Sequence, residues 1–322
     1  MKKKSLIYVA GHNGMAGAAV LKALNTAGYQ NILTRSRKKL DLKNYNQVEA
    51  FLKKSKPEYI FFFAGKVGGI LANNTYPAEF IYENLAMQNN IIDLSYRYNV
   101  KKLLFLACSC AYPKKCPQPI KEEYLMAGAL EPTNEPFAVA KLAGIKMCQA
   151  YARQYKVKFI PVISGNLYGP NEYSKESGHV VASLIWKFYK AKTEHRKVVE
   201  IWGSGKPKRD FLYVDDLAEA CIFLMKYYNL SELINIGTGI EASIRKLANL
   251  IAEITDFKGK IAYNRAKSDG NLRRFLDISK INRLGWFAKT NLNDGLVLTY
   301  NWFKQRYIHE YTKKSPEKGH SS

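Results

Sequence analysis

The sequence predicts an α/β protein with a doubly wound parallel sheet and a smaller C-terminal lobe. A glycine-rich turn stands between a short β-rich run and a helical pattern at the N-terminus. Strand-like and helix-like segments then alternate up to about residue 168. The run EYIFFFAG (58–65) is continuously apolar after Glu58, as in strands that are covered on both faces. Together these features are typical of a Rossmann-type domain, in which helices cover both faces of a parallel sheet.

The expected elements of this first domain follow one another in a regular order. Short apolar or β-rich runs predict strands over 5–11, 31–34, 58–65, 101–109 and 158–165. Apolar residues at helical spacing predict helices over 15–28, 47–56, 78–99 and 135–155.

The regular alternation ends near residue 168, where we place a domain boundary. Residues 169–312 mix short apolar segments (198–205, 209–227, 233–239) with loops, which predicts a smaller lobe with some elements returning to the first domain. Residues 313–322 are polar with Pro, Gly and Ser, and are expected to be disordered.

Composition narrows the class of protein. The longest apolar runs are too short for a membrane span, and the N-terminus lacks the pattern of a secretion signal. The five cysteines are an odd number without disulfide-like spacing, which favours a reducing cytoplasm. The net charge of +23 would suit nucleic acid, but most lysines are dispersed, so we expect no nucleic-acid partner and favour a small anionic ligand.

The turn YVAGHNGMAG predicts a dinucleotide site. Its glycines (Gly11, Gly14 and Gly17) let the backbone turn tightly and approach a pyrophosphate at the helix N-terminus. A purely structural turn is the alternative. Asn13 and Met15 lie in the same loop and complete the expected contacts.

The residues after the second strand favour NADP(H) over NAD. An NAD site usually has an acidic residue there for the ribose hydroxyl. This chain instead has Arg35 and Arg37, where a 2′-phosphate would sit, and Asp41 is placed near the adenine. A solvated charge run remains the other interpretation.

Longer strings resemble the GDP-L-fucose synthases, which belong to the extended short-chain dehydrogenase/reductase family. The resemblance covers roughly residues 5 to 305 and rests on AGKVGGILANNTYPAEFIYENLAMQNNII, NLYGPN, WGSGKPKRDFLYVDDLA, INIGTG and LGW. It implies an NADPH-binding domain over 1–168, a GDP-sugar lobe mainly over 169–312, and a homodimer. It also implies 3,5-epimerisation and 4-reduction of GDP-4-keto-6-deoxy-mannose.

The reductase positions implied by this resemblance are altered. The family has a tyrosine four residues before a lysine on one helix, as the acid that protonates the sugar. Here Lys141 is present, but the tyrosine position is Phe137, which has no proton to give. The family serine is Cys108, a weak hydrogen-bond donor. Ser109 and Tyr112 lie near enough in sequence to be considered as substitutes.

The epimerase positions match the family. Cys110 matches the thiol that exchanges protons at carbon, and His179 matches its partner. A thiol and an imidazole suit proton transfer near neutral pH. A small core cysteine and a loop histidine are the alternatives. The cysteine spacing is not that of a zinc site, so no metal is expected.

The resemblance also implies a set of GDP-sugar contacts in the second lobe. They are Asn166, His179, Lys187, Trp202, Arg209 and Asp269. Departures from the family strings around 163–166 and 267–275 leave the exact sugar open.

Two explanations of Phe137 stay open. It is either an engineered loss of the phenol in an ordinary member or a natural change in a paralogue; the accompanying Cys108 favours the second. A paralogue would act on a related GDP-4-keto sugar, mainly as an epimerase or atypical reductase. A catalytically silent NADP-binding protein is the competing class, against which Lys141, Cys110 and His179 argue.

Overall fold

The main domain is built on a six-stranded parallel sheet. In the computed structural model, which describes residues 1–172, 178–267 and 269–312, the strand order is β2-β1-β3-β4-β5-β9. The strands are β1 (Ile7–Ala10), β2 (Ile32–Leu33), β3 (Tyr59–Phe62), β4 (Lys102–Cys108), β5 (Lys158–Ser164) and β9 (Ile234–Ile236). Every neighbouring pair is parallel. The predicted fold class is therefore confirmed.

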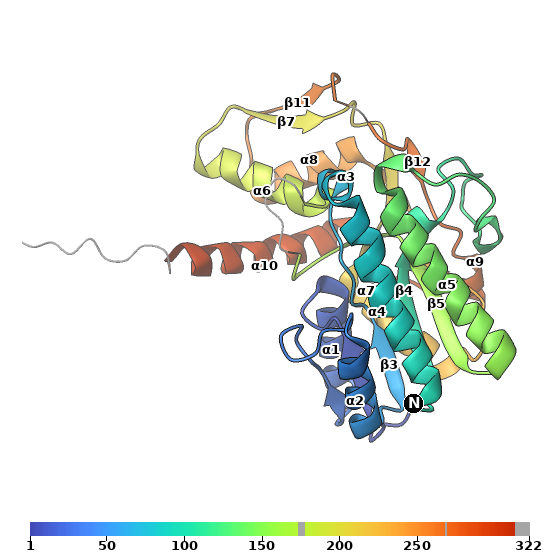
Figure 1. Ribbon diagram of the computed structural model, residues 1–322. Coiled ribbons are helices and arrows are strands. Elements are labelled where there is room, and N and C mark those ends of the chain that lie inside the picture. The colour runs from blue at the N-terminus through green and yellow to red at the C-terminus, as the bar shows by residue number, and fades with distance from the viewer. Residues whose placement is uncertain (173–177, 268, 313–322) are drawn as a thin grey trace, which may run out of the picture.

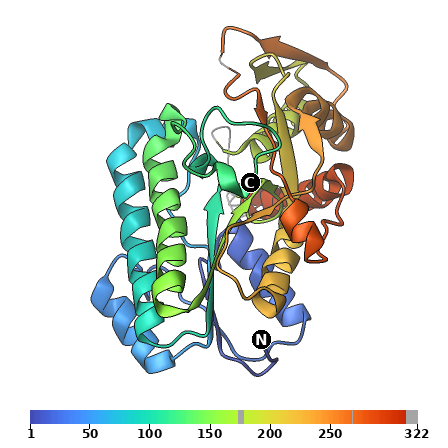
Figure 2. The same ribbon diagram turned by 90° about the vertical axis from the view of Figure 1, so that its right-hand side faces the viewer.

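Helices cover both faces of this sheet (Figure 2). One face carries α2 (Tyr45–Ser55), α4 (Pro77–Arg97) and α5 (Glu135–Tyr155); the other carries α1 (Met15–Thr26) and α7 (Val214–Tyr227). Successive side chains of each strand point to opposite faces of the sheet and so pack in both cores. In β1, Ile7 and Val9 pack in the core under α1 and α7, whereas Tyr8 packs in the core under α4 and α5. This is why consecutive residues in the middle of these strands are apolar.

The second lobe lies beyond one end of the sheet (Figure 1). Strand β8 (Lys208–Tyr213) lies between β10 (Glu241–Ser243) and β12 (Arg273–Arg274) and also pairs with β6 (Asn166–Tyr168), and β7 (Val198–Trp202) pairs with β11 (Lys260–Asn264). Helices α6 (Val180–Thr193), α8 (Ile244–Thr255) and α10 (Leu292–Thr312) pack with these strands in a third apolar core. Short helices complete the chain: η1 (Ser109–Ala111), η2 (Glu122–Tyr124), η3 (Pro132–Asn134), α3 (Ile70–Thr75) and α9 (Ser279–Arg283).

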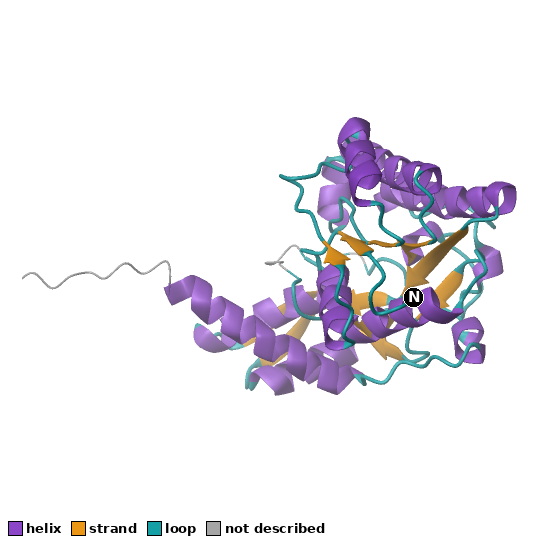
Figure 3. Cartoon of the chain, turned by 90° about the horizontal axis from the view of Figure 1, so that it is seen from below, coloured by secondary structure: helices purple, strands orange, loops and turns teal. Residues whose placement is uncertain are grey.

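Two segments from the second half of the chain lie in the first domain. Helix α7 packs on α1, and β9 adds the last strand of the main sheet next to β5. Seen from below, the helices surround the strands of the main sheet, while α10 extends away from them (Figure 3). The expected tail over 313–322 lies outside the described residues. Within the described chain, no helix is both long and apolar enough to cross a membrane.

Candidate active site

The glycine turn lies at the carboxyl end of β1, the strand at which the strand order of the sheet reverses. Strand β2 pairs with one side of β1 and β3 with the other, and ligands of doubly wound sheets bind at such a point. A Cβ on Gly11 (φ +88°) would lie 2.6 Å from the amide nitrogen of Ala64, and one on Gly17 would lie 2.2 Å from the carbonyl oxygen of Gly11. Gly14 caps α1 without a side-chain hydrogen bond. The backbone is thus compact on its inner side and open at the helix N-terminus, as a phosphate cradle requires.

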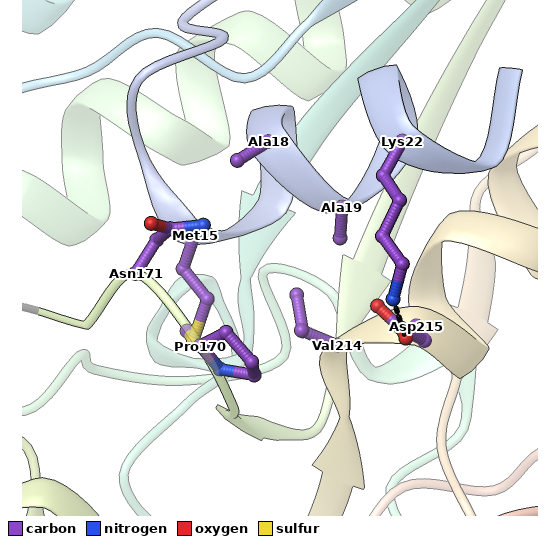
Figure 4. A pocket seen from close by; sticks show the side chains of 8 residues that line it. All are labelled: Met15, Ala18, Ala19, Lys22, Pro170, Asn171, Val214 and Asp215. Carbon is purple, nitrogen blue, oxygen red and sulfur yellow. Dashed lines mark hydrogen bonds and ion pairs between the residues drawn. The ribbon is translucent and has the colours of Figure 1, made fainter. Parts of the chain in front are cut away.

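A small pocket of about 120 Å³ lies beside this turn (Figure 4). It is lined by α1, by the segment after β6 and by the start of α7: Met15, Ala18, Ala19, Lys22, Pro170, Asn171, Val214 and Asp215. An ion pair of 2.9 Å joins Lys22 to Asp215 along its side. The pocket contains Met15 of the predicted cofactor set but none of the predicted catalytic side chains.

The two arginines after β2 differ in their partners. Arg37 forms an ion pair of 3.2 Å with Glu83 of α4. Arg35 is exposed and donates to the carbonyl oxygen of Thr34, which leaves most of its guanidinium donors available. The Asp41 carboxylate accepts from a backbone N–H two residues ahead, in a local turn. Arg35 is therefore the stronger candidate for a ribose phosphate.

Phe137 and Lys141 are buried one turn apart on α5. The Lys141 ammonium lies 5.8 Å from the centroid of the Phe137 ring and donates to the carbonyl oxygen of Leu106 in β4, 3.4 Å away. Burial lowers the pKa of Lys141 to about 8. The Phe137 and Phe80 rings pack edge to face, with centroids 6.1 Å apart. The four-residue spacing noted in the sequence thus places the Lys141 ammonium against the Phe137 ring, which has no hydroxyl.

The end of β4 corrects our expectation for the cysteines. The strand ends at Cys108, and the following η1 turn brings Cys110 back beside it, so that the two sulfurs form a disulfide. The expectation of no disulfide, based on spacing, was therefore wrong. Strand geometry alone did not reveal that a tight turn follows Cys108 directly.

Tyr112 is not a substitute for the missing phenol. Its side chain is fully buried, and its hydroxyl donates to the Asn235 amide oxygen at 2.7 Å. Burial also raises its pKa above the ordinary value. The hydroxyl is thus committed to a structural hydrogen bond inside the protein.

An unpredicted residue, Arg274, holds the turn that contains Cys110. From β12 it donates to the carbonyl oxygens of Ser109 and Tyr112, the latter at 2.8 Å, and only 9% of it is exposed. Its neighbour across the strand pair is Arg209 of β8. Burial, together with the charge of Arg274, lowers the pKa of Arg209 to about 10. The two adjacent arginines of LRRF (272–275) are the sequence feature that could have indicated this residue.

His179 and Glu172 flank a segment that lies outside the described residues. His179 is exposed and directly precedes α6, and the protein around its imidazole lowers the pKa by desolvation. Burial raises the pKa of Glu172 to about 7, and the nearby backbone N–H of His179 opposes this rise. No hydrogen bond or ion pair between described atoms joins Cys110 to His179.

Of the predicted substrate residues in the second lobe, Lys187 contacts Trp202 and Asp269 holds the loop that follows Trp202. This side chain, at the end of β7, is 64% exposed, and the ammonium of Lys187 lies 5.4 Å from its ring centroid. Lys267 approaches the same indole at 5.6 Å. Asp269 accepts from the backbone N–H of Ser204 at 2.6 Å and from its hydroxyl at 2.7 Å, which fixes the loop after Trp202.

Asn166 stands apart from this group, as the first residue of β6. It is half-buried and pairs in register with Phe211 of β8. The short strand therefore places Asn166 near the junction of the main sheet and the second lobe.

Comparisons with known proteins agree with this arrangement. Residues 7–237 match the NAD dependent epimerase/dehydratase family. GDP-L-fucose synthase 1 from Arabidopsis thaliana is 47% identical over 302 residues, covering 94% of both chains. GDP-L-fucose synthase from Escherichia coli is 41% identical over 310 residues, covering 93% of this chain and 97% of that one. A GDP-mannoheptose C4 reductase from Campylobacter jejuni, solved with NADP bound, superposes with a TM-score of 0.88 at 40% identity over 94% of this chain and 99% of that one.

Proposed function

The chain belongs to the NAD dependent epimerase/dehydratase family, and we propose that it is an NADPH-dependent enzyme acting on a GDP-4-keto-6-deoxy-sugar. The names of its relatives support a nucleotide-sugar epimerase/reductase of the GDP-L-fucose synthase type. Within that activity, we infer that proton exchange at C3 and C5 proceeds while reduction at C4 is impaired. The observation that supports this division is Phe137, which stands beside Lys141 without a hydroxyl.

The cofactor proposal rests on the glycine turn and on Arg35. Gly11 and Gly17 leave no room for side chains, and Gly14 leaves the N-terminus of α1 open for a pyrophosphate. The exposed guanidinium of Arg35 is suited to a 2′-phosphate. When bound, NADPH supplies a hydride to the sugar ketone.

The second lobe offers groups that suit a GDP-sugar. An exposed indole with two neighbouring ammonium groups can stack a nucleobase, and Lys187 and Lys267 provide those charges at Trp202. Arg209 carries a guanidinium that can bind a diphosphate with two parallel hydrogen bonds. These residues are proposed substrate contacts, together with Asn166 and Asp269.

Proton transfer at carbon is assigned to Cys110 and His179. The C4 ketone acidifies the protons on C3 and C5, and a thiolate near neutral pH can accept one of them. The lowered pKa of His179 keeps its imidazole neutral at neutral pH, so it can also accept or relay a proton. This role requires the reduced form of Cys110, because a disulfide sulfur carries no proton.

Reduction requires a proton for the sugar oxygen, and Phe137 cannot supply it. Lys141 has a pKa of about 8 and remains mostly protonated at neutral pH. Its position against the ring allows it to stabilise negative charge nearby, but the proton donor of the family, a phenol at position 137, is missing. We therefore expect slow reduction by the protein as it stands.

A related GDP-4-keto sugar is the alternative substrate. The similarity to a reductase of a GDP-heptose favours this possibility, because the loops around 163–166 and 267–275 depart from the fucose synthase strings. A silent NADP-binding role is disfavoured by the presence of Lys141, Cys110 and His179 together.

Two further assignments stay predictions. The homodimer implied by the family resemblance would use α4 and α5, which lie side by side on one face of the sheet (Figure 2). These helices carry large exposed side chains, such as Tyr82 and Tyr155. The cytoplasmic location rests on the sequence alone.

The decisive experiment incubates the reduced protein with GDP-4-keto-6-deoxy-mannose in deuterated water, with and without NADPH. We expect deuterium at C3 or C5 in both cases and little C4 reduction. Cys110→Ser should abolish most of the exchange, whereas Cys148→Ser, a change in the core of α5, should not. Absence of exchange in the reduced wild-type protein would contradict the proposed function.

A further inference from the structure

The two cysteines at the end of β4 are held as a pair by the backbone. Their Cα atoms are 5.3 Å apart, within the range that disulfides span. Arg274 donates to the carbonyl oxygens of Ser109 and Tyr112, one on each side of Cys110. The turn is therefore fixed by contacts that do not involve the sulfurs, and bond formation needs little loss of chain entropy.

The pair can be reached from solvent, unlike the buried cysteines Cys148 and Cys221. Cys108 and Cys110 are both half-buried, as is Cys116. Cys148 and Cys221 are fully buried in helices, and burial raises their pKa values above the ordinary thiol value. Cys116 is half-buried and unbonded. A small thiol or disulfide reagent should thus react at the pair in preference to the buried cysteines.

Both members of the pair occupy positions assigned to the chemistry. Bonded to Cys108, the sulfur of Cys110 cannot accept a proton from carbon, and Cys108 cannot donate a hydrogen bond. The reduced pair restores both abilities. Opening and closing one covalent bond therefore changes two groups of the proposed site at once.

We propose that Cys108 and Cys110 form a reversible thiol–disulfide modification site that switches proton exchange off when oxidised and on when reduced. The reactant is a small-molecule disulfide, such as oxidised glutathione. The existence of the site stands on the cysteine pair itself, whereas its effect on exchange rests on the proposed function.

The chemistry balances in two exchange steps. The thiolate of one cysteine attacks the reagent disulfide, forming a mixed disulfide and releasing one reduced thiol. The second cysteine, after losing its proton, attacks the protein sulfur of the mixed disulfide and releases the second reduced thiol. Two electrons pass from the protein sulfurs to the reagent, and the reverse sequence restores both protein thiols.

The test equilibrates the full-length protein in mixtures of reduced and oxidised glutathione. Mass spectrometry of proteolytic peptides measures the loss of two hydrogen atoms between Cys108 and Cys110, and deuterium uptake measures exchange on the same samples. We expect exchange to fall by about 10²-fold or more as the bond forms, the usual contribution of a general base, and to recover with excess reduced glutathione.

Two variants separate this site from general thiol damage. Cys108→Ser keeps the Cys110 thiol but lacks the second thiol that would close the internal bond, so its peptide should stop at the glutathione adduct and never show the loss of two hydrogen atoms. Cys116→Ser is the matched control at a cysteine outside the pair and should retain the sensitivity of the wild type.

Each outcome has a definite meaning. A peptide without the Cys108–Cys110 bond, or one that stops at a glutathione adduct, overturns the site. A fully bonded protein that still exchanges overturns the switch. If the bond forms and opens while the reduced protein shows no exchange, the modification site is supported and the proposed function is contradicted.

Discussion

Restoring a phenol at position 137 tests the assignment of the reductase position most directly. In Phe137→Tyr, the new hydroxyl is added to a ring whose centroid lies 5.8 Å from the Lys141 ammonium. At an effective dielectric constant of about 20, a charge at this distance stabilises a phenolate by about 3 kcal/mol, or about two pKa units. Burial acts in the opposite direction, since only 8% of Phe137 is exposed. We expect the two effects to offset each other and leave the phenol near its ordinary pKa of about 10, so that it is protonated at neutral pH and can donate its proton to the alkoxide that forms at C4.

The expected gain is large and specific to reduction. A positioned general acid contributes about 10²–10⁴-fold, so C4 reduction should rise by that factor while C3 and C5 exchange changes less. The assay is the loss of NADPH absorbance in a single turnover at saturating cofactor, with deuterium uptake measured in parallel under reducing conditions.

The control is the double variant Phe137→Tyr/Lys141→Met. Without the ammonium, the buried phenol loses about two pKa units of acidity, and if the rate follows half of this change, the gain in reduction falls by about tenfold. A folded, NADPH-binding Phe137→Tyr protein whose reduction rate stays at the wild-type level would refute the assignment. A fall of about 1–3 kcal/mol in its free energy of unfolding would show that the hydroxyl found no partner.

Three further predictions follow from the geometry. Arg35→Ala should weaken NADPH binding by about tenfold with little effect on NADH, because a charged hydrogen bond to the 2′-phosphate is lost. Arg37→Ala should weaken it less, because the Arg37 side chain is already paired with Glu83. Equal affinities of the wild-type protein for NADPH and NADH in a titration would contradict this assignment. Lys141 has a folded pKa of about 8 against an unfolded value of 10.5, so the unfolded chain binds more protons between these pH values, and the free energy of unfolding should rise by up to about 3 kcal/mol across that window. Denaturant unfolding of Lys141→Met should lack this rise, and parallel pH profiles of the two proteins would disprove the burial of the charge. Light scattering at micromolar concentration should give twice the mass of the chain, and a strictly monomeric mass would exclude the α4–α5 dimer.

Local pattern was enough to predict the strands and helices of the main sheet up to β5. Continuous apolar strands, the helical spacing of 135–155 and the glycines after β1 can each be recognised from residues that are close together in the sequence. The structure has these elements close to the predicted bounds. The pairing of Phe137 with Lys141 was predictable for the same reason, because a separation of four residues on a helix always places two side chains on one face.

The chemical state of the site depended on contacts between distant segments. The Tyr112 hydroxyl is committed to Asn235, and Arg274 reaches the turn of Cys110 from a strand near the C-terminus. The depressed pKa of Lys141 arises from burial between α5 and β4. The Cys108–Cys110 bond depended on a turn directly after a strand, which residue spacing did not reveal. Sequence periodicity reports which face a residue lies on, but partners, burial and protonation follow from what the folded chain brings against that face.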